Sequence, residues 1–385
     1  MDTHETHEVQ AGVRPLPVLR AMVDAIDREI LQLLARRYSL VADIAVHKRA
    51  HHLPIRDLPR EREILSDRRG RGERLGLSPE LVESFWRLIL WASRDRQAAL
   101  RAEVPPDIEP RTVAVIGGRG AMGGCFAQMF GDLGHAVMVA DLETTLTPEE
   151  AVEAAEVAVI SVPIEATEGV IRSLGPRVRA DGLLMDVTSL KAGPMRAMLE
   201  STAASVVGTH PLFGPSVHSL QGQRVVLTPG RGEEWLEWVR GMLRARGLVL
   251  VETTPEEHDR TMAVVQVLVH YATEVMGAAL ARLGLPLEET LRFTSPVYLL
   301  DLLLTARHFA QSPELYAAIH LLNPAAGEVT AAFVAAAEEL RAAAAAGDRA
   351  AFETLFGRVR AYFGEFTGRA LEQSDFLIDR VVERA

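Results

Sequence analysis

Gly118-Arg119-Gly120-Ala121-Met122-Gly123 follows the apolar run Val113 to Ile116, and Asp141 closes the next apolar run eighteen residues later. A G-x-G-x-x-G pattern between a strand and a helix lets the backbone approach a pyrophosphate, whose charge then faces the helix N-terminus. An acid at the end of the second strand accepts hydrogen bonds from a ribose and repels a 2′-phosphate. The pattern therefore predicts an α/β domain that binds a dinucleotide and prefers NAD to NADP.

Further short apolar runs follow the fingerprint and alternate with helical segments. This alternation is typical of a mostly parallel sheet covered by helices. From Pro255 onward the strand pattern stops and every segment is predicted to be helical. The predicted strands are Val113 to Ile116, Ala136 to Ala140, Val157 to Val162, Leu183 to Val187, Val206 to Val207, Val225 to Leu227, and Leu248 to Val251.

The chain before the fingerprint is also predicted to be helical. Apolar residues recur at three- and four-residue steps from about Pro17 to Ala50, which indicates one long helix. A second helix begins near Asp57 and Pro59, and a third opens at Ser78 and runs to about Arg101. A helix of some thirty residues is roughly 45 Å long, so we expect the first helix to pack against a second copy of itself.

The predicted fold class is multidomain. We expect an all-α N-terminal domain at 16–102, an α/β Rossmann-type domain at 112–254, and an all-α dimerisation and substrate domain at 255–385. A disordered tail at 1–15 precedes them, and a stiff, proline-rich linker at 103–111 separates the first two domains.

Composition excludes several classes of function. The net charge of −11 argues against a nucleic-acid partner. The single cysteine, Cys125, excludes an internal disulfide and agrees with a reducing compartment. Met1 to Gln10 does not resemble a secretory signal, and we expect no membrane span, so the predicted location is the cytoplasm. Beyond His4 and His7 and the adjacent His51 and His52, the twelve histidines show no metal-ligand spacing, so no metal is expected.

One histidine stands out in Gly208-Thr209-His210-Pro211-Leu212-Phe213-Gly214-Pro215, downstream of the fingerprint. The flanking glycines and prolines predict a rigid loop. Histidine accepts a proton near neutral pH, and rigid neighbours fix the direction of its ring. His210 is therefore the candidate general base, placed beside a hydride acceptor.

These motifs resemble the prephenate dehydrogenase family. The resemblance rests on the fingerprint, on Ser161-Val162-Pro163, on Ser189-Leu190-Lys191, and above all on Thr209 to Pro215. The N-terminal helices are similar to the all-helical chorismate mutases. Joined in this order, the domains resemble the bifunctional chorismate mutase/prephenate dehydrogenases over nearly everything after the first fifteen residues.

The resemblance implies a role for each dehydrogenase residue. His210 accepts the hydroxyl proton of prephenate while hydride passes to the nicotinamide, Ser189 orients the imidazole, and Arg307 grips a substrate carboxylate. Leu299 stands where bifunctional relatives often have an arginine, which argues against a second cationic anchor there. His258 and His270 line the substrate site or couple it to inhibition, and Lys191 and Tyr316 are further candidates. The cofactor residues are Gly118, Gly120, Met122, Gly123, Asp141, Ser161 and Pro163.

The mutase reaction is a pericyclic rearrangement of chorismate, which needs shape and fixed charge rather than a nucleophile. Arg37 and Lys48 fall within about 20° of each other around a helix, and Arg20 lies about 100° away. By resemblance, Arg20 reaches into the partner subunit's site and holds a carboxylate, as Arg37 does. Lys48 with Gln97 donates to the ether oxygen. The remaining pocket residues are Asp57, Arg60, Glu61 and Ser93.

The leading hypothesis is a homodimeric, NAD-dependent bifunctional enzyme of tyrosine biosynthesis that takes chorismate and prephenate as substrates. One alternative keeps the dehydrogenase and makes the helical N-terminal domain a dimerising or regulatory module. Others are a dehydrogenase for small β-hydroxy acids and a non-enzymatic NAD sensor. The residues leave open whether arogenate is accepted, whether tyrosine inhibits, and whether prephenate passes directly between the sites.

Overall fold

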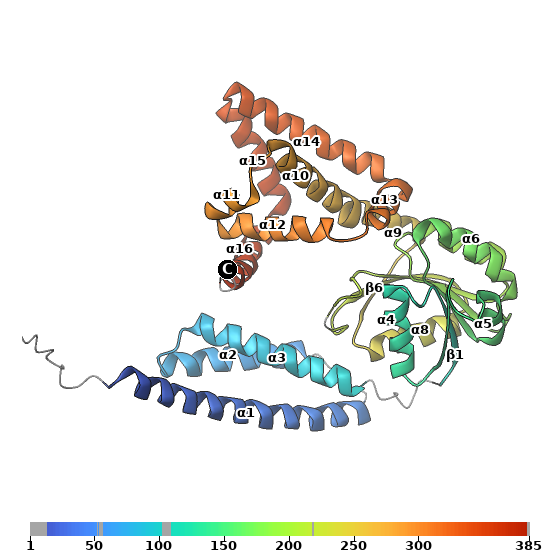
Figure 1. Cartoon of the computed structure of the whole chain (residues 1–385), viewed down its shortest axis with the longest axis horizontal. Coiled ribbons are helices and arrows are strands. Elements are labelled where there is room, and N and C mark those ends of the chain that lie inside the picture. The colour runs from blue at the N-terminus through green and yellow to red at the C-terminus, as the bar shows by residue number, and fades with distance from the viewer. Residues whose placement is uncertain (1–13, 52, 54–56, 102–108, 218, 383–385) are drawn as a thin grey trace, which may run out of the picture.

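The structure is a computed structural model, and it describes residues 14–51, 53, 57–101, 109–217 and 219–382. Figure 1 shows two helical regions and one α/β region along the chain. Nearly all of the tail predicted at 1–15 and most of the linker predicted at 103–111 lie outside the described residues.

The first region consists of α1 (Leu16–Ala50), α2 (Leu58–Arg74) and α3 (Pro79–Arg101), as predicted. Side chains cap two of these helices: Asp57 Oδ1 accepts the Arg60 N–H at 3.0 Å, and Ser78 Oγ accepts the Leu81 N–H at 3.3 Å. Helix α3 packs against both α1 and α2.

Helix α1 leaves much of its apolar surface exposed in the single chain. Val23, Ile26, Ile30 and Leu33 are each about half exposed or more. Contiguous apolar surface of this kind marks an interaction site. This exposure agrees with the expectation that α1 packs against a second copy.

The central region contains one seven-stranded sheet with the order β2-β1-β3-β4-β5-β6-β7. All seven predicted strands are confirmed. The pairing is parallel throughout, except between β5 and β6, which are antiparallel. The strands are β1 (Thr112–Ile116), β2 (Ala136–Ala140), β3 (Val157–Ile160), β4 (Leu183–Asp186), β5 (Ser205–Pro211), β6 (Arg224–Arg231) and β7 (Val249–Glu252).

Helices cover both faces of this sheet and form two hydrophobic cores. Helices α4 (Ala121–Asp132) and α8 (Glu233–Ala245) cover one face, with Phe130 and Leu243 fully buried. The other face is covered by α5 (Pro148–Ala154), α6 (Ile164–Leu174) with the short 3₁₀ turn Gly175–Arg177, and α7 (Ala192–Ser201).

The segment around His210 is a strand as far as Pro211, so the predicted loop begins only at Leu212. Residues 205–211 form β5, in which His210 is opposite Val226 of β6. Gly208 serves close packing rather than a turn, because a Cβ there would lie 2.2 Å from Thr228 Oγ1. Pro211 stands at the very end of the strand, where a missing N–H is tolerated.

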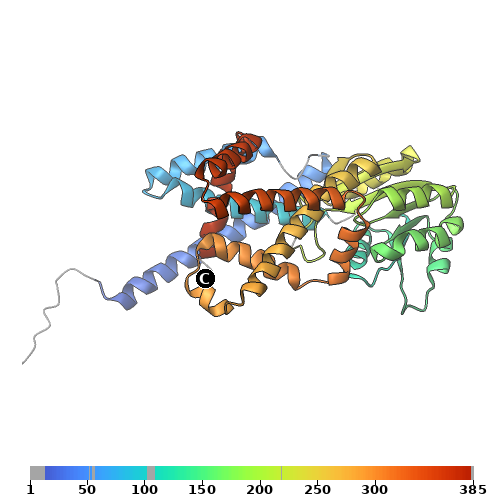
Figure 2. The same cartoon turned by 90° about the horizontal axis from the view of Figure 1, so that it is seen from above.

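The C-terminal region is entirely helical in its described part and begins with one unbroken helical run. This run comprises α9 (Pro255–Met262), a π-helical segment (Ala263–Leu268) and α10 (Val269–Leu283). The remaining helices are α11 (Leu287–Arg292), α12 (Pro296–Phe309), α13 (Pro313–Leu322), α14 (Ala326–Ala346), α15 (Arg349–Phe363) and α16 (Phe366–Val382). Seen from above in Figure 2, both helical regions extend to the same side of the sheet region.

The helical run Pro255–Leu283 is long and apolar enough to cross a membrane by length and composition alone. Length and composition do not distinguish a membrane span from a core helix, so the expectation of no membrane span stays a prediction. The run nevertheless carries His258 and Asp259, both buried, and it packs against α7 and α14. The run is therefore packed against other helices of the protein.

Candidate active sites

The glycine fingerprint forms a turn at the carboxyl end of β1 that only small residues fit. Gly117 has a φ of 80°, and a Cβ on it would lie 2.2 Å from the carbonyl oxygen of Ser161. A Cβ on Gly123 would lie 2.3 Å from the carbonyl oxygen of Gly117. Gly120 is the exposed N-cap of α4 and offers no side chain to the first helical N–H groups. These groups can bind a phosphate anion.

The acid expected to hold the ribose lies beside this turn. Asp141 follows β2, the parallel neighbour of β1, and its Oδ2 accepts the Arg119 N–H at 2.9 Å. Ser161 and Pro163 follow β3, the other neighbour of β1, and Met122 is half-buried in the first turn of α4. The predicted cofactor residues therefore meet at the carboxyl ends of three adjacent strands, which is where α/β sheets bind dinucleotides. The residues fit NAD.

His210 lies inside the protein and contacts groups from the helical run. Its side chain is buried, with 2% of the residue exposed. His210 Nδ1 lies 2.8 Å from His258 Nε2, and His258 Nδ1 lies 2.8 Å from Asp259 Oδ1. On the other side of the ring, His210 Nε2 lies 3.3 Å from Gln266 Nε2.

The surroundings of His210 favour its neutral form. Burial lowers the pKa of His210 well below its ordinary value, and the nearby His258 and Lys191 lower it further. A neutral imidazole has one nitrogen lone pair free to accept a proton. The electrostatics therefore suit the predicted general base.

The orienting role expected for Ser189 stays a prediction. Ser189 is half-buried directly after β4, but among the described residues the ring nitrogens of His210 contact His258 and Gln266 instead. The motif Glu257-His258-Asp259 could be recognised in the sequence. The residues around it do not indicate that His258 contacts His210, which lies 48 residues earlier in the chain. Gln266 was not predicted at all.

Lys191 has a structural position, and its suggested role as a substrate ligand stays a prediction. Its side chain is fully buried, and Nζ pairs with Asp186 Oδ2 and donates to the carbonyl oxygen of Thr209 at 2.7 Å. Burial lowers the pKa of Lys191 and raises the pKa of Asp186, against the mutual attraction of the two charges. Lys191 thus ties the end of β4 to the strand that carries His210.

A second cluster of rings lies farther along the same helical run. His270 packs edge-on against Tyr316, with ring centroids 4.8 Å apart, and Tyr316 stacks on His308 at 3.8 Å. Burial, together with the nearby His308 and His320, lowers the pKa of His270 to about 4, whereas Glu274 acts in the opposite direction. A cavity of about 500 Å³ opens beside this cluster, with Tyr271, Glu274, His308, Tyr316 and His320 in its lining.

Arg307 lies next to His308 on α12, and its side chain is exposed. Burial raises the pKa of the Tyr316 hydroxyl, and the positive charge of Arg307 acts to lower it. His270 lies one helical turn beyond Gln266, which contacts His210. The structure therefore brings His270 and Tyr316 together, and Arg307 precedes His308 of the same cluster on α12. Leu299 lies on the same helix as Arg307 and is half-buried.

In the N-terminal region, three predicted mutase residues meet between α1 and α3. Arg37 Nη1 donates to Ser93 Oγ, and Gln97 Nε2 donates to the carbonyl oxygen of Ser93 at 3.1 Å. Gln97 Oε1 is buried without a hydrogen-bond partner in the described structure, so it can accept a donor from a ligand. Burial lowers the pKa of Arg37, and the positive charge of Arg68, which was not predicted, lowers it further.

The other predicted mutase residues lie on α1 and at the start of α2. Glu61 Oε1 accepts from Arg94 Nη1 at 2.6 Å, an ion pair that the sequence did not indicate. Lys48 is half-buried near the end of α1, whereas Arg20 is exposed near its start. Asp57 caps α2, and Arg60 is exposed and paired with Glu63 at 2.6 Å. Arg20 therefore lies near the opposite end of α1 from Lys48, in agreement with the expectation that a partner subunit supplies this arginine.

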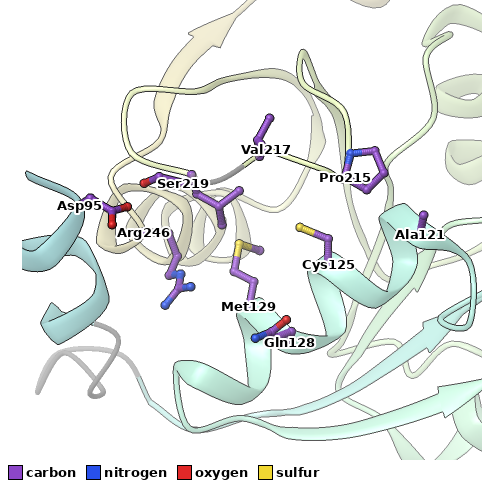
Figure 3. Close-up of a pocket in the computed structure, with 10 residues that line it drawn as sticks. Asp95, Ala121, Cys125, Gln128, Met129, Pro215, Val217, Ser219 and Arg246 are labelled. Carbon is purple, nitrogen blue, oxygen red and sulfur yellow. The ribbon is translucent and has the colours of Figure 1, made fainter. Parts of the chain in front are cut away.

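A further cavity of about 400 Å³ lies between α4, the segment after β5, and α3 (Figure 3). Ala121 and Cys125 line it from α4, Pro215 and Val217 from the segment after His210, and Asp95 from α3. None of the predicted catalytic residues lines this cavity.

Comparison with known proteins assigns both halves of the chain. Residues 19–98 match the model of chorismate mutase type II, residues 134–252 that of the prephenate dehydrogenase nucleotide-binding domain, and residues 254–358 that of the prephenate dehydrogenase dimerization domain. The T-protein of Enterobacter agglomerans is 36% identical over 368 residues, which cover 95% of this chain and 98% of that protein. The chain belongs to the T-protein family. The T-protein of Haemophilus influenzae is 33% identical and covers 94% of this chain and 96% of its own length.

A solved structure has the same fold as the dehydrogenase part. The prephenate dehydrogenase from Aquifex aeolicus, in complex with hydroxyphenyl propionate and NAD+, matches with a TM-score of 0.55 at 20% identity. The match covers 69% of this chain and 99% of that one. The predicted fold class, a helical mutase domain followed by a Rossmann-type domain and a helical domain, is thereby confirmed, as is the predicted membership of the bifunctional family.

Proposed function

We propose that this chain rearranges chorismate to prephenate and then oxidises prephenate, with NAD, to 4-hydroxyphenylpyruvate and carbon dioxide. The observation that carries the proposal is the presence of both sites in one chain: Arg37, Ser93 and Gln97 meet in the helical region, and a buried, neutral His210 follows a glycine turn that fits NAD. The two activities supply the first and second steps of a route to tyrosine.

In the mutase site, positioned charged and hydrogen-bonding side chains stabilise the transition state. Arg37 holds a substrate carboxylate, and Arg20 of a partner subunit holds the other. As the ether bond breaks, negative charge grows on its oxygen, which Lys48 and Gln97 stabilise by hydrogen bonding. Glu61 and the region of Asp57 bind the ring hydroxyl. Arg60 and Ser93 complete the pocket. No proton or covalent bond to the protein is needed.

In the dehydrogenase site, His210 accepts the proton of the ring hydroxyl on Nε2. NAD supplies the acceptor for the hydride that leaves the same ring carbon. The carbon–carboxylate bond then breaks, and its electron pair completes the aromatic ring as carbon dioxide departs. The phenolate oxygen takes up the proton, so no net proton is gained or lost. Arg307, His270 and Tyr316 bind the substrate side chain and carboxylate.

We further propose a homodimer in the cytoplasm, with domain limits at 16–102, 112–254 and 255–385. The match to a dimerization domain and the exposed apolar surface of α1 support the dimer. Tyrosine is proposed as an inhibitor acting near His270, since the resemblance links that position to inhibition.

The test combines wild-type protein with two variants that separate the activities. Pure wild-type protein given chorismate and NAD should produce NADH without any added mutase. His210→Asn should still convert chorismate to prephenate and bind NADH, while its dehydrogenase turnover falls by roughly 10²–10⁴-fold. Lys48→Ala should oxidise prephenate normally and fail to consume chorismate. A wild-type protein that oxidises prephenate but leaves chorismate unchanged would make the helical region a non-catalytic module.

A further inference from the structure

Three buried side chains form a hydrogen-bonded chain that ends at the proposed base. Asp259 Oδ1 contacts His258 Nδ1 at 2.8 Å, and His258 Nε2 contacts His210 Nδ1 at 2.8 Å. The three residues are 1–2% exposed. Each nitrogen of the two imidazole rings therefore has a protein partner.

Asp259 fixes the direction of this chain because it can only accept. Its Oδ1 also accepts the Lys191 N–H at 2.8 Å, and its Oδ2 accepts the Ala192 N–H at 2.9 Å. Burial acts to raise the pKa of Asp259, but the hydrogen bonds from His258 and from these two N–H groups outweigh it and lower that pKa below its ordinary value. The group is thus a carboxylate, and an ionised carboxylate donates no hydrogen bond.

One arrangement of protons follows for two neutral rings. His258 must carry its hydrogen on Nδ1 to donate to Asp259, so its Nε2 is an acceptor. His210 must then carry its hydrogen on Nδ1 to donate to that acceptor. The lone pair of His210 is left on Nε2, the nitrogen that faces Gln266. The Gln266 amide nitrogen lies 3.3 Å from it, which suits a donor pointing at a lone pair.

We propose that His258 and Asp259 are positioning residues that hold His210 in the tautomer whose Nε2 accepts the substrate proton. The inference rests on the proposed dehydrogenase function. When Nε2 takes up that proton, the His210 Nδ1–H remains bonded to His258, and the Asp259 carboxylate stabilises the new positive charge through the intervening ring. The other charged groups facing His210 are Lys191 and its partner Asp186.

The test uses two amide substitutions that differ by one methylene. The His258→Gln side chain can place its amide oxygen near the former Nε2 position and still accept the His210 Nδ1–H. The His258→Asn side chain is too short to do so. Both variants lose the ring and its packing, so a merely structural role predicts similar losses in each.

All measurements use the full-length protein, and wild-type turnover of prephenate with NAD is established first. Wild-type inactivity would refute the proposed function, whereas the tautomer proposal is judged by variants relative to an active wild type. We expect His258→Asn to lower dehydrogenase kcat by roughly 10²–10⁴-fold, with the Kd for NADH and the mutase kcat unchanged. We expect His258→Gln to stay within about tenfold of wild type, as befits one altered hydrogen bond. Equal losses in the two variants, or a change confined to the KM for prephenate, would overturn the proposal.

A second measurement requires no variant at the positioning residues. Nitrogen-15 NMR of histidine-labelled wild-type protein at pH 7 should show His210 protonated at Nδ1 and bare at Nε2. The signals are assigned by their absence in His210→Asn. Protonation at Nε2 instead would overturn the proposal even if both His258 variants failed to fold.

Discussion

Replacing Lys191 by methionine tests whether this residue supports the fold or binds substrate. The Lys191 and Asp186 side chains are both fully buried, and Lys191 Nζ also donates to the Thr209 carbonyl oxygen at 2.7 Å. Lys191→Met leaves the Asp186 carboxylate buried without its counter-charge and the Thr209 oxygen without this donor. Breaking a buried ion pair from one side costs about 3–5 kcal/mol.

This cost is large enough to measure by differential scanning calorimetry. At roughly 2–4 °C for each kcal/mol in a domain of about 150–250 residues, the unfolding temperature of the dehydrogenase part should fall by about 6–20 °C. The matched control is the double variant Asp186→Leu/Lys191→Met, which removes both charges of this pair and should recover most of the loss.

A different pattern would show that the structural assignment is wrong. If Lys191→Met unfolds within about 2 °C of wild type while the KM for prephenate rises, Lys191 binds substrate as the sequence suggested. If the double variant is no more stable than the single one, the loss does not arise from an unpaired charge.

Three further predictions follow from the two sites. Because the pKa of His210 lies well below its ordinary value and the neutral ring is the active form, kcat/KM for prephenate should stay constant from pH 8 down to about 6.5 and decline only at lower pH; a decline centred above pH 7 would contradict the assignment. Arg37→Ala removes the charged contact to Ser93 and should lower kcat/KM for chorismate by about 10- to 100-fold, whereas the exposed neighbour Arg36→Ala should have little effect in the same assay. Asp141→Ser removes the acid beside the glycine turn, so the ratio of kcat/KM for NADP to that for NAD should rise by about tenfold or more; an unchanged ratio would place the ribose elsewhere.

Much of the fold could be predicted because its signals are local. The apolar periodicity of α1 and the fingerprint between β1 and α4 are each formed by residues that are close together in the sequence. Parallel pairing then brings Asp141 and Ser161 to the glycine turn, since carboxyl ends of adjacent parallel strands share one edge. The meeting of these residues at one edge of the sheet could therefore be predicted from local patterns.

The surroundings of His210 could not be predicted in the same way. His258 lies 48 residues away and Gln266 56 residues away, and Gln266 is aimed by a π-helical segment that leaves no clear mark in the sequence. The glycine and prolines near His210 suggested a loop, but tertiary packing against Thr228 decides that Gly208 belongs to a strand. Lys191 likewise looks like any surface lysine until Asp186 is placed next to it.

Because His210 lies on β5, the stability of its main chain and the reactivity of its side chain depend on different parts of the protein. Its main chain is part of the sheet, whose amide hydrogens should exchange with solvent only when the whole domain opens. The side chains that adjust its ring, His258 and Gln266, belong to the helical run at the start of the other domain. Mutational drift in that run can therefore retune the reactivity of the base while the strand that anchors it keeps its thermodynamic stability.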